Sequence, residues 1–230
     1  MRAIVTGASR GLGLLIAEEL ESQGLEVVSP SRDRLWILKE EADVLVNNAA
    51  VYGPIGSFAT NDWEAWRQTF DIDFLLPAKL CHMVLPGMIK RGYGKIINIS
   101  GGGACEARPN FSAYSAAKTA LVRFTETLAE EVRLFHIDVN AVAPGAHFSG
   151  LTKKVLEAGP EIAGIEEYRN AEKTRAESPD VLDAVRLCAF LASRRSDGVT
   201  GRLISALWDP WEVLAGAVSD TDQYTLRRTT

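Results

Sequence analysis

Tyr114 and Lys118 are the residues whose types and spacing best suit proton transfer. They stand four residues apart near the start of a helix predicted over residues 112–135, so their side chains should point from the same face. A lysine ammonium near a phenol favours the phenolate and lowers the pKa of the tyrosine, which makes a usable general acid or base. A pair at this spacing is more often a plain surface contact, so the neighbouring motifs decide its role.

A glycine-rich turn separates the first predicted strand, 3–6, from the first predicted helix, 12–23. Gly7, Gly11 and Gly13 allow the backbone to turn tightly and approach a pyrophosphate, whose negative charge suits the positive end of the following helix. These are the properties of a dinucleotide site. Such turns also occur without a ligand, and the spacing G-x-x-x-G-x-G differs from the usual G-x-G-x-x-G fingerprint.

Apolar runs alternate with amphipathic stretches along most of the chain. The predicted strands are 3–6, 26–29, 43–47, 95–100, 138–143 and 202–207, and the predicted helices are 12–23, 63–91, 112–135 and 180–193. This alternation predicts an α/β fold, a doubly wound parallel sheet covered by helices, and one domain over 1–230. The near-continuously apolar strands agree with a sheet that is covered on both faces.

The stretch 150–178 departs from this alternation, because it carries eleven charged residues and no strand pattern. One interpretation is a pair of solvated surface helices. The other is a lid over a substrate cleft, which its position after the strand 138–143 favours. Both interpretations can hold together.

Three further motifs give the pair Tyr114 and Lys118 a context. The turn 7–13, the segment Asn47–Ala50 and the dipeptide Pro144-Gly145 follow in an order and spacing that resemble the short-chain dehydrogenase/reductase family, from Arg2 to about Asp209. The resemblance implies a Rossmann-like fold. It also implies that Tyr114 donates the proton. Lys118 would activate this tyrosine and bind the nicotinamide ribose.

The same resemblance assigns the remaining cofactor contacts. The segment after the third predicted strand lies beside the cofactor, the loop after the fifth meets the nicotinamide amide, and the glycine turn binds the pyrophosphate. The residues so assigned are Gly7, Ser9, Arg10, Gly11, Leu12, Gly13, Asn48, Ala49, Ala50, Pro144, Gly145 and Ser149.

The family's catalytic serine lies thirteen residues before the tyrosine, where this chain has Gly101, and the nearest hydroxyl is Ser100. A slip of one residue on a strand turns the side chain to the other face. The run Gly101–Gly103 is nevertheless permissive enough for a shift that returns Ser100 to the site. Both alternatives stay open, and Ser100 is a candidate catalytic residue. If Ser100 faces away, Tyr114 and a backbone N–H of the glycine run hold the substrate oxygen, and Gly101→Ser should raise turnover.

Asp73 occupies the place of the family's active-site asparagine. By the resemblance, that residue acts largely through its backbone carbonyl and a water that leads to the lysine, so Asp73 is a candidate catalytic residue and activity should survive the substitution. The alternative is an ion pair inside a helix, for example with Lys118, which would raise the pKa of the lysine.

Only ten residues separate Arg32 from Asp43, where the family has a helix, a strand and a helix. The resemblance therefore predicts a six-stranded sheet that lacks the third strand, in the order 2-1-4-5-6-7 by the family's numbering. The adenine pocket should be shallower than usual.

Arginines near the expected adenosine ribose favour NADP(H) over NAD(H). Arg10 and Arg32 can pair with a 2′-phosphate, while Ser31 stands where NAD enzymes place a ribose-binding acid. Asp33 is adjacent and weakens this preference.

The net charge of −5 and the isoelectric point near 5.4 leave no basic field for nucleic acid or an anionic membrane. No uninterrupted apolar run reaches the ~18 residues of a membrane span, and the chain enters its first strand without a signal segment. Cys81, Cys105 and Cys188 suggest buried small residues in a reducing compartment, and no metal-ligand spacing is present. We therefore expect a cytoplasmic protein without a metal site.

Together these features predict an NADP(H)-dependent oxidoreductase that interconverts a small carbonyl compound and its secondary alcohol. Gly101, Asp73 and the shortened segment keep open a rival, a catalytically weakened relative that binds dinucleotide as a binding or scaffold subunit. Dehydration or epimerisation by the same pair is a third alternative. The resemblance implies a homodimer or homotetramer, and the tail 219–230 should be loosely ordered or committed to a subunit contact.

Overall fold

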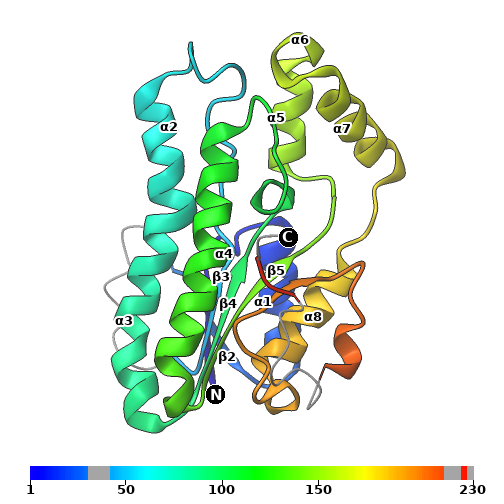
Figure 1. Ribbon diagram of the computed structural model, residues 1–230. Helices are drawn as coiled ribbons and strands as arrows, with labels where there is room; N and C mark the ends of the chain where they lie inside the picture. The colour runs from blue at the N-terminus through cyan, green and yellow to red at the C-terminus, as the bar shows by residue number, and fades with distance from the viewer. Residues whose placement is uncertain (31–41, 215–223, 227–230) are drawn as a thin grey trace.

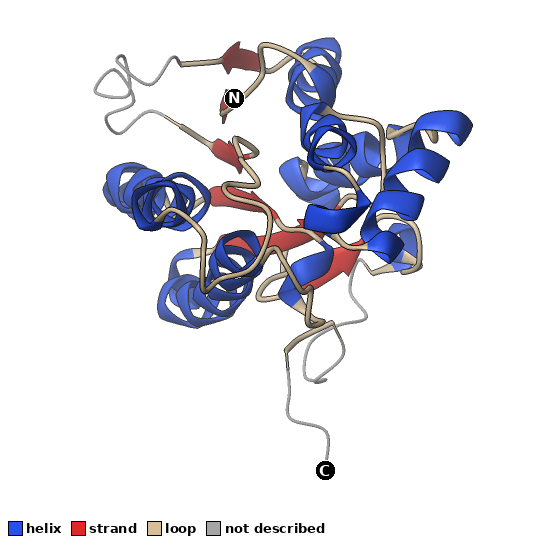
Figure 2. Cartoon of the chain, turned by 90° about the horizontal axis from the view of Figure 1, so that it is seen from above, coloured by secondary structure: helices blue, strands red, loops and turns tan. Residues whose placement is uncertain are grey.

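Six parallel strands form one sheet in the computed structural model, which describes residues 1–30, 42–214 and 224–226 (Figure 1, Figure 2). The strands are β1 (Arg2–Val5), β2 (Glu26–Val28), β3 (Val44–Asn47), β4 (Gly94–Ile99), β5 (Ile137–Ala143) and β6 (Leu203–Ser205). Their order is β2-β1-β3-β4-β5-β6, and every neighbouring pair is parallel. The expected α/β class, doubly wound sheet and strand order are confirmed.

Helices cover both faces of the sheet (Figure 2). One face carries α1 (Gly11–Ser22) and α8 (Leu182–Ala192), and the other carries α3 (Leu76–Arg91) and α4 (Ser112–Val132). The short α2 (Trp63–Phe70) precedes α3. Helices α5 (Gly150–Ala158), α6 (Pro160–Ala163) and α7 (Ile165–Glu177) lie together at the top of Figure 1, beyond the end of β5.

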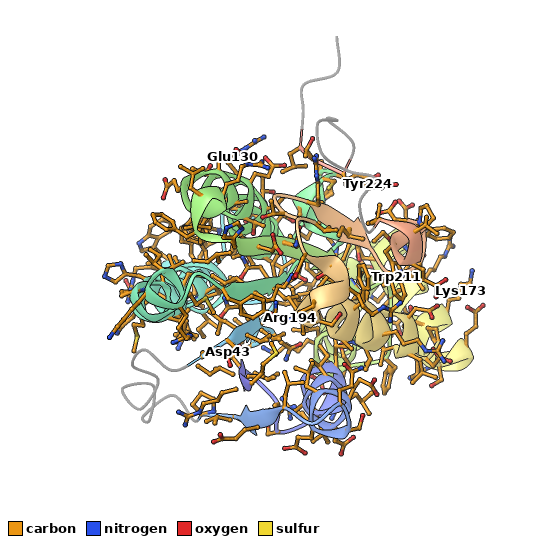
Figure 3. The ribbon with its side chains drawn as sticks, turned by 90° about the horizontal axis from the view of Figure 1, so that it is seen from below. Asp43, Glu130, Lys173, Arg194, Trp211 and Tyr224 are labelled. Carbon is orange, nitrogen blue, oxygen red and sulfur yellow. The ribbon has the colours of Figure 1, made fainter. Side chains whose placement is uncertain are left out.

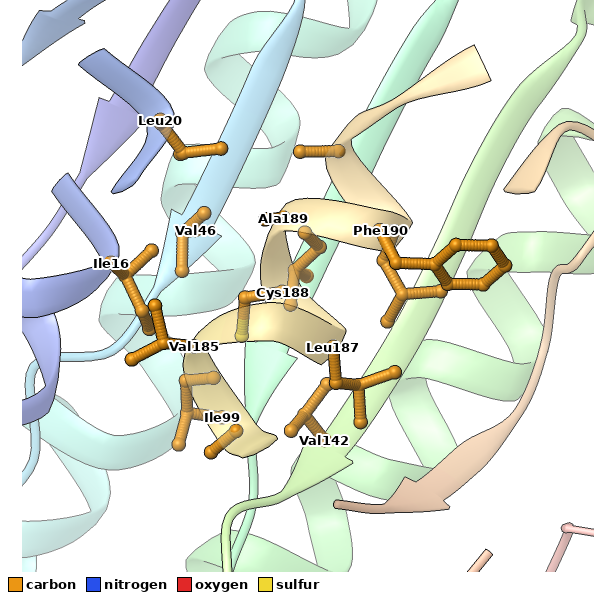
Figure 4. Packing of buried hydrophobic residues seen from close by; sticks show 14 of the residues in the cluster. Ile16, Leu20, Val46, Ile99, Val142, Val185, Leu187, Cys188, Ala189 and Phe190 are labelled. Carbon is orange, nitrogen blue, oxygen red and sulfur yellow. The ribbon is translucent and has the colours of Figure 1, made fainter. Parts of the chain in front are cut away.

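Apolar side chains from the two faces of the sheet form two separate core clusters. Figure 4 shows the cluster under α1 and α8, where Ile16 and Leu20 meet Val46 of β3 and Val185 of α8. The second cluster joins α3 and α4 to the opposite face. Successive residues of β4 pack into opposite clusters, since Ile97 belongs to the first and Ile96 to the second.

The predicted helix 63–91 is a continuous helical run with a change of geometry in its middle. Its start is capped by Asp62, whose side chain accepts a hydrogen bond of 2.7 Å from the backbone N–H of Ala65. A π-helical turn, Asp71–Leu75, then separates α2 from α3. Single π-turns inside α-helices often accompany functional sites.

The run Trp63–Arg91 is also long and apolar enough to cross a membrane by length and composition alone. Its most apolar window is 39% buried inside the protein, and one such run is weak evidence because the core helix of a soluble protein has the same character. Leu80 and Val84 of this run belong to the core beneath α3 and α4. The expectation of no membrane contact stays a prediction.

The stretch 150–178 is helical and has a small core of its own. Val155 of α5 and Ala171 of α7 are buried against Phe111, which lies at the start of α4. Ser149 caps α5 by accepting hydrogen bonds from the backbone N–H groups of Leu151 and Thr152. The segment therefore packs on the loop that precedes the predicted catalytic helix.

The structure corrects the expectation for one of the three cysteines and describes only part of the tail 219–230. Cys81 and Cys188 are buried as expected, but Cys105 is exposed because it lies in the loop after β4. Of the tail 219–230, only 224–226 are described, and the carbonyl of Tyr224 accepts a hydrogen bond of 2.7 Å from the N–H of Leu203. Figure 3 shows Tyr224, and also Trp211, which packs on Phe190 with ring centres 5.9 Å apart.

Candidate active site

A cleft of about 1650 Å³ opens at the carboxyl ends of the strands. Its walls come from the loops after β1, β3, β4 and β5, the start of α4, and helices α5 and α7. Many of the predicted site residues line it together: Gly7, Ser9, Arg10, Gly11, Leu12, Gly13, Asn48, Ala49, Ala50, Ser100, Tyr114, Lys118, Pro144, Gly145 and Ser149. Asp73 lies behind this wall, whereas Ser31 and Arg32 fall outside the described residues.

Tyr114 is almost fully buried beside the cleft and packs edge-on against Tyr52, with ring centres 4.7 Å apart. Burial raises the pKa of the Tyr114 phenol above its ordinary value. Tyr52 and Asp73 raise the pKa further, whereas Arg108 opposes the shift. The pKa of Tyr114 therefore shifts upward, opposite to the expected lowering by Lys118, because loss of solvent outweighs the opposing charge of Arg108.

Lys118 is fully buried one helical turn after Tyr114, with its ammonium 5.6 Å from the centre of the Tyr114 ring. Its Nζ donates a hydrogen bond of 2.9 Å to the carbonyl of Ile99 at the end of β4, and lies 3.8 Å from Oδ2 of Asp73. Burial lowers the pKa of Lys118, and Asp73 acts in the opposite direction. The proposed ion pair is thus present as a contact, but it does not produce the expected net rise in the pKa of the lysine.

Asp73 lies on the π-turn and has no exposed surface. Its Oδ1 accepts a hydrogen bond of 2.8 Å from the N–H of Val51, and its Oδ2 has no hydrogen-bond partner among the residues that the structure describes. Burial raises the pKa of Asp73 to about 6, against the opposing effects of Lys118 and Val51. The carboxyl therefore joins the loop after β3 to the lysine, with one acceptor atom unused.

Gly101 occupies the position that faces the Tyr114 hydroxyl. Its backbone is extended, with φ −175°, but a Cβ added there would overlap Oη of Tyr114. Ser100 is buried, and its hydroxyl makes no hydrogen bond within the described chain. Ser100 and Tyr114 therefore line the same cleft without a hydrogen bond between them in the described chain, and the space that a serine at position 101 would need is filled by the phenol.

The glycine turn and the loop after β3 fit closely together. Gly7 has φ +66°, and a Cβ on it would come within 2.9 Å of the Cα of Ala49. The Nδ2 of Asn48 donates to the carbonyls of Thr6 and Gly7, at 3.0 and 3.3 Å. A Cβ at Gly13 would overlap Asn48 Nδ2, so glycine is required there for the helix to approach this loop.

Thr6 connects the same two loops, although it was not predicted as a site residue and only directly precedes the glycine turn in the sequence. Its Oγ1 accepts hydrogen bonds from the N–H groups of Asn48, at 2.9 Å, and Ala49, at 3.1 Å. The available signal was its position, a hydroxyl residue at the end of a buried strand and directly before a glycine turn. Leu12, by contrast, places its side chain in the core under α1 and α8.

The start of α1 fits the pyrophosphate of a dinucleotide. Arg10 precedes the helix without capping it, because its side chain makes no hydrogen bond to the first turn. Gly11 has φ +59° and open space where a Cβ would stand. A helix start that faces a cleft with uncapped N–H groups attracts an anion. The residues present would hold the pyrophosphate through backbone N–H groups of the turn.

The loop after β5 forms the opposite wall. Gly145 has φ +83°, and its carbonyl lies 3.2 Å from Nδ1 of His147. Ser149 lines the cleft, but its hydroxyl oxygen already accepts from the first turn of α5. Its predicted contact with the nicotinamide amide therefore competes with its capping role. Among the residues the structure describes, no three metal-ligating side chains group together.

A cluster around Arg108 was not predicted from the sequence. Arg108 lies in the loop between β4 and α4, with its guanidinium 4.2 Å from the centre of the Phe111 ring and 5.0 Å from that of Tyr52. It forms a salt bridge of 2.7 Å with Glu167 of α7. Tyr52 and Glu167 stand 56 and 59 residues from Arg108, so no local spacing could reveal the cluster.

Comparisons with known proteins agree with this geometry. Residues 38–159 match the family model described as short chain dehydrogenase. The human protein "Dehydrogenase/reductase SDR family member 4" is 28% identical over 88% of this chain and 84% of its own length. The "3-oxoacyl-[acyl-carrier-protein] reductase FabG" of Haemophilus influenzae is 30% identical over 86% of this chain and 93% of its own.

A solved structure shows the same arrangement. The aldohexose dehydrogenase of Thermoplasma acidophilum, in its ligand-free form, superposes with a TM-score of 0.74 at 26% identity. The match covers 89% of this chain and 91% of that one. The likeness thus spans the sheet and both helical layers.

Proposed function

Because the chain belongs to the short-chain dehydrogenase family, whose members are oxidoreductases acting on CH–OH or carbonyl groups with NAD(P), we propose that it interconverts a small carbonyl compound and its secondary alcohol using NADP(H). The observation that carries the proposal is the placement of Tyr114 and Lys118 on one helix face, both buried and both lining the cleft that the glycine turn also lines.

Tyr114 supplies the proton in the proposed reaction. Its raised pKa keeps the phenol protonated near neutral pH, so Oη can donate a hydrogen bond to a carbonyl oxygen and then its proton as the alcohol forms. When bound, the dinucleotide supplies or accepts the hydride. Aromatic contact with Tyr52 fixes the ring, which keeps Oη at the cleft.

Lys118 has a positioning role as well as an electrostatic one. Its hydrogen bond to the Ile99 carbonyl ties α4 to the end of β4, and its charge offsets the phenolate that remains after proton donation. Lys118 can pass a proton to the phenolate, and the protonated carboxyl of Asp73, which faces the same ammonium, can then return a proton to the lysine. Because Gly101 carries no hydroxyl, a backbone N–H of the glycine run donates the second hydrogen bond to the substrate oxygen in this proposal.

Arg10 supports the preference for NADP(H). It lines the cleft at the start of α1, beside the turn that would hold the pyrophosphate. The proposal that Arg32 also pairs with the 2′-phosphate, and that Ser31 stands in place of a ribose-binding acid, rests on the sequence, since both residues fall outside the described part of the chain. A 2′-phosphate near Arg10 would gain charge-assisted hydrogen bonds that NAD(H) lacks.

Turnover on a broad panel of ketones, aldehydes and secondary alcohols tests the proposal. The nicotinamide absorbance follows oxidation of NADPH or NADH by the carbonyl compounds and reduction of NADP⁺ or NAD⁺ by the alcohols. Turnover of at least one compound supports an enzyme. The rival, a dinucleotide-binding scaffold, is favoured by the absent serine hydroxyl beside Tyr114, and it predicts NADPH binding without turnover of any compound.

We also propose that the chain forms a homodimer or homotetramer in the cytoplasm. Support comes from a row of aromatic rings along α2, the π-turn and α4, with neighbouring ring centres 5.2 to 6.2 Å apart. This aromatic row comprises Phe58, Trp63, Trp66, Phe70, Phe74 and Phe124. Phe58 and Trp63 are 61% and 59% exposed, and a large exposed apolar patch is typical of an interface.

A further inference from the structure

Arg108 combines a fixed position with an available charge on the wall of the cleft. Its guanidinium lies over the rings of Phe111 and Tyr52 and 5.9 Å from the centre of the Tyr114 ring, so it is close to the proposed proton donor. Guanidinium groups stack well on aromatic faces, and stacking orients their N–H donors. Arg108 is therefore placed in the part of the cleft that a substrate bound at Tyr114 would reach.

Glu167 holds this guanidinium from the opposite side. Nε and Nη2 of Arg108 donate hydrogen bonds of 2.7 Å each to the two carboxylate oxygens, which fixes the plane of the group. Nη1 makes no hydrogen bond within the described part of the chain. Burial disfavours the charge of Arg108 and is the largest single effect on its pKa, but the hydrogen bonds and charges of Glu167 and Tyr52 together outweigh it and raise the pKa, so the group stays cationic.

The surrounding charges do not cancel this cation. In the described chain, six cationic side chains and four acidic ones line the cleft. The cations are Arg10, Arg108, Lys118, Lys153, Lys154 and Lys173, and the acids are Glu106, Glu167, Glu177 and Asp209. The chain as a whole carries −5, so the cleft is more positive than the rest of the molecule. A cleft of this kind concentrates small anions.

We propose that Arg108 binds a carboxylate on the substrate, so that the site selects keto acids and their hydroxy acids in which the carboxylate stands a few bonds from the reacting carbon. The proposal rests on the proposed function, because Tyr114 defines where that carbon lies. Nη1 donates to the carboxylate, Glu167 is a positioning residue that fixes the guanidinium, and α7 thereby connects the helical segment 150–178 to substrate recognition.

The binding of keto acids to the protein saturated with NADP⁺ tests the role of Arg108 without requiring turnover. The probes are pyruvate, acetoacetate and levulinate, each paired with its methyl ester, and the dissociation constants come from calorimetry. We expect at least one acid to bind about tenfold to a hundredfold more tightly than its ester, the range for hydrogen bonds to a charged group. Arg108→Gln should remove that preference, and Arg108→Lys should keep part of it because the charge remains.

Matched variants separate recognition from a structural contact. Arg169→Gln, on the exposed side of α7, should leave the preference for acids intact. Glu167→Gln keeps a hydrogen-bonding side chain, removes a competing anion, and should preserve or increase the preference. If every acid binds no better than its ester, or if Arg108→Gln weakens acid and ester equally, Arg108 and Glu167 only connect the loop to α7 and the proposal is overturned.

A separate turnover assay with neutral ketones distinguishes failure of the proposal for Arg108 from failure of the proposed oxidoreductase function. Turnover of neutral ketones without a preference for acids removes the role of Arg108 and leaves the oxidoreductase. Acid binding that depends on Arg108, in a protein that turns over no carbonyl compound, supports the anion site and removes the oxidoreductase.

Discussion

Tyr114, Lys118 and Asp73 form a buried group of ionisable side chains in which burial shifts each pKa toward the neutral form. Lys118 is the centre of the group, since its ammonium contacts both the Ile99 carbonyl and the Asp73 carboxyl. At the scale of single residues, removal from water therefore matters more than the charge of a neighbour. The phenol is kept protonated, which suits a proton donor.

Asp73 makes a measurable contribution to the pH dependence of stability. Burial raises its pKa to about 6, above the value of about 3.9 for an exposed aspartate. The folded state thus holds this proton more tightly than the unfolded chain does, and the free energy of unfolding falls as the pH rises from about 4 to about 6. The two pKa units correspond to up to about 2.7 kcal/mol.

Asp73→Asn should remove that slope. The difference in free energy of unfolding between variant and wild type should move in favour of the variant by up to about 2–3 kcal/mol between pH ~4 and pH ~7, measured by urea denaturation. Asp71→Asn on the same π-turn is the control, because that carboxylate is partly exposed and pairs with Arg67. Parallel stability profiles for wild type and Asp73→Asn would show that Asp73 does not titrate in this range.

Substitution at Gly101 tests how tightly the phenol is held. Gly101→Ala places a Cβ against Oη of Tyr114, so turnover should fall by about tenfold to a hundredfold, and Gly101→Ser should fall as well rather than gain activity. Gly102→Ala is the control, since a Cβ there meets no atom within 4 Å. A gain of turnover in Gly101→Ser would mean that the phenol moves aside and that the serine completes the site.

At the scale of the elements, the ends of parallel strands bring the site together. The loops after β1 and β3 meet through Thr6 and Asn48, and the loops after β4 and β5 supply the other walls of the cleft. The uncapped start of α1 faces the same cleft. The cofactor site is therefore a product of strand order, and it needs few dedicated side chains.

Arg10 at this helix start should set the choice between the two cofactors. Arg10→Gln should weaken NADPH binding by about tenfold to a hundredfold and leave NADH affinity nearly unchanged, because only NADPH carries the 2′-phosphate. Calorimetry with both cofactors measures this, and Arg186→Gln on the exposed side of α8 is the control. Equal losses for NADPH and NADH would place Arg10 at the pyrophosphate instead.

The strands and the main helices could be predicted from the sequence because their apolar residues recur with the period of each element. The strand order followed from the family resemblance together with the short segment between Arg32 and Asp43. The π-turn could not be predicted, since one extra residue barely alters the apolar pattern of 63–91. The pKa of Tyr114 was also beyond reach, because it depends on burial that only the packed chain defines.

At the scale of the whole molecule, the aromatic row presents two strongly exposed rings, those of Phe58 and Trp63. Trp63 stacks on Trp66 with ring centres 5.3 Å apart, and Trp66 in turn donates a hydrogen bond of 3.1 Å to Ser112 at the start of α4. Exposed rings at this density favour association with another surface. In the proposed homo-oligomer, a second copy of the chain covers these rings.

Light scattering after size exclusion should therefore give the mass of a dimer or tetramer at micromolar concentration. Trp63→Glu places a charge in the aromatic row and should shift the population toward a smaller species. Trp208→Glu serves as the control, because Trp208 is 84% exposed at the edge of the cleft. A monomeric wild type, or equal masses for wild type and Trp63→Glu, would contradict the assignment of this face to self-association.

The central claim is that Tyr114 donates the proton in hydride transfer to a carbonyl, and Tyr114→Phe tests it most directly. The variant keeps the aromatic ring that packs on Tyr52 and loses only the hydroxyl. Single-turnover reduction of a carbonyl substrate by the NADPH-loaded protein, followed at the nicotinamide absorbance, should slow by about 10²–10⁴-fold while NADPH remains bound. A variant that retains most of the wild-type rate would contradict the account, because another group would then have to protonate the substrate oxygen.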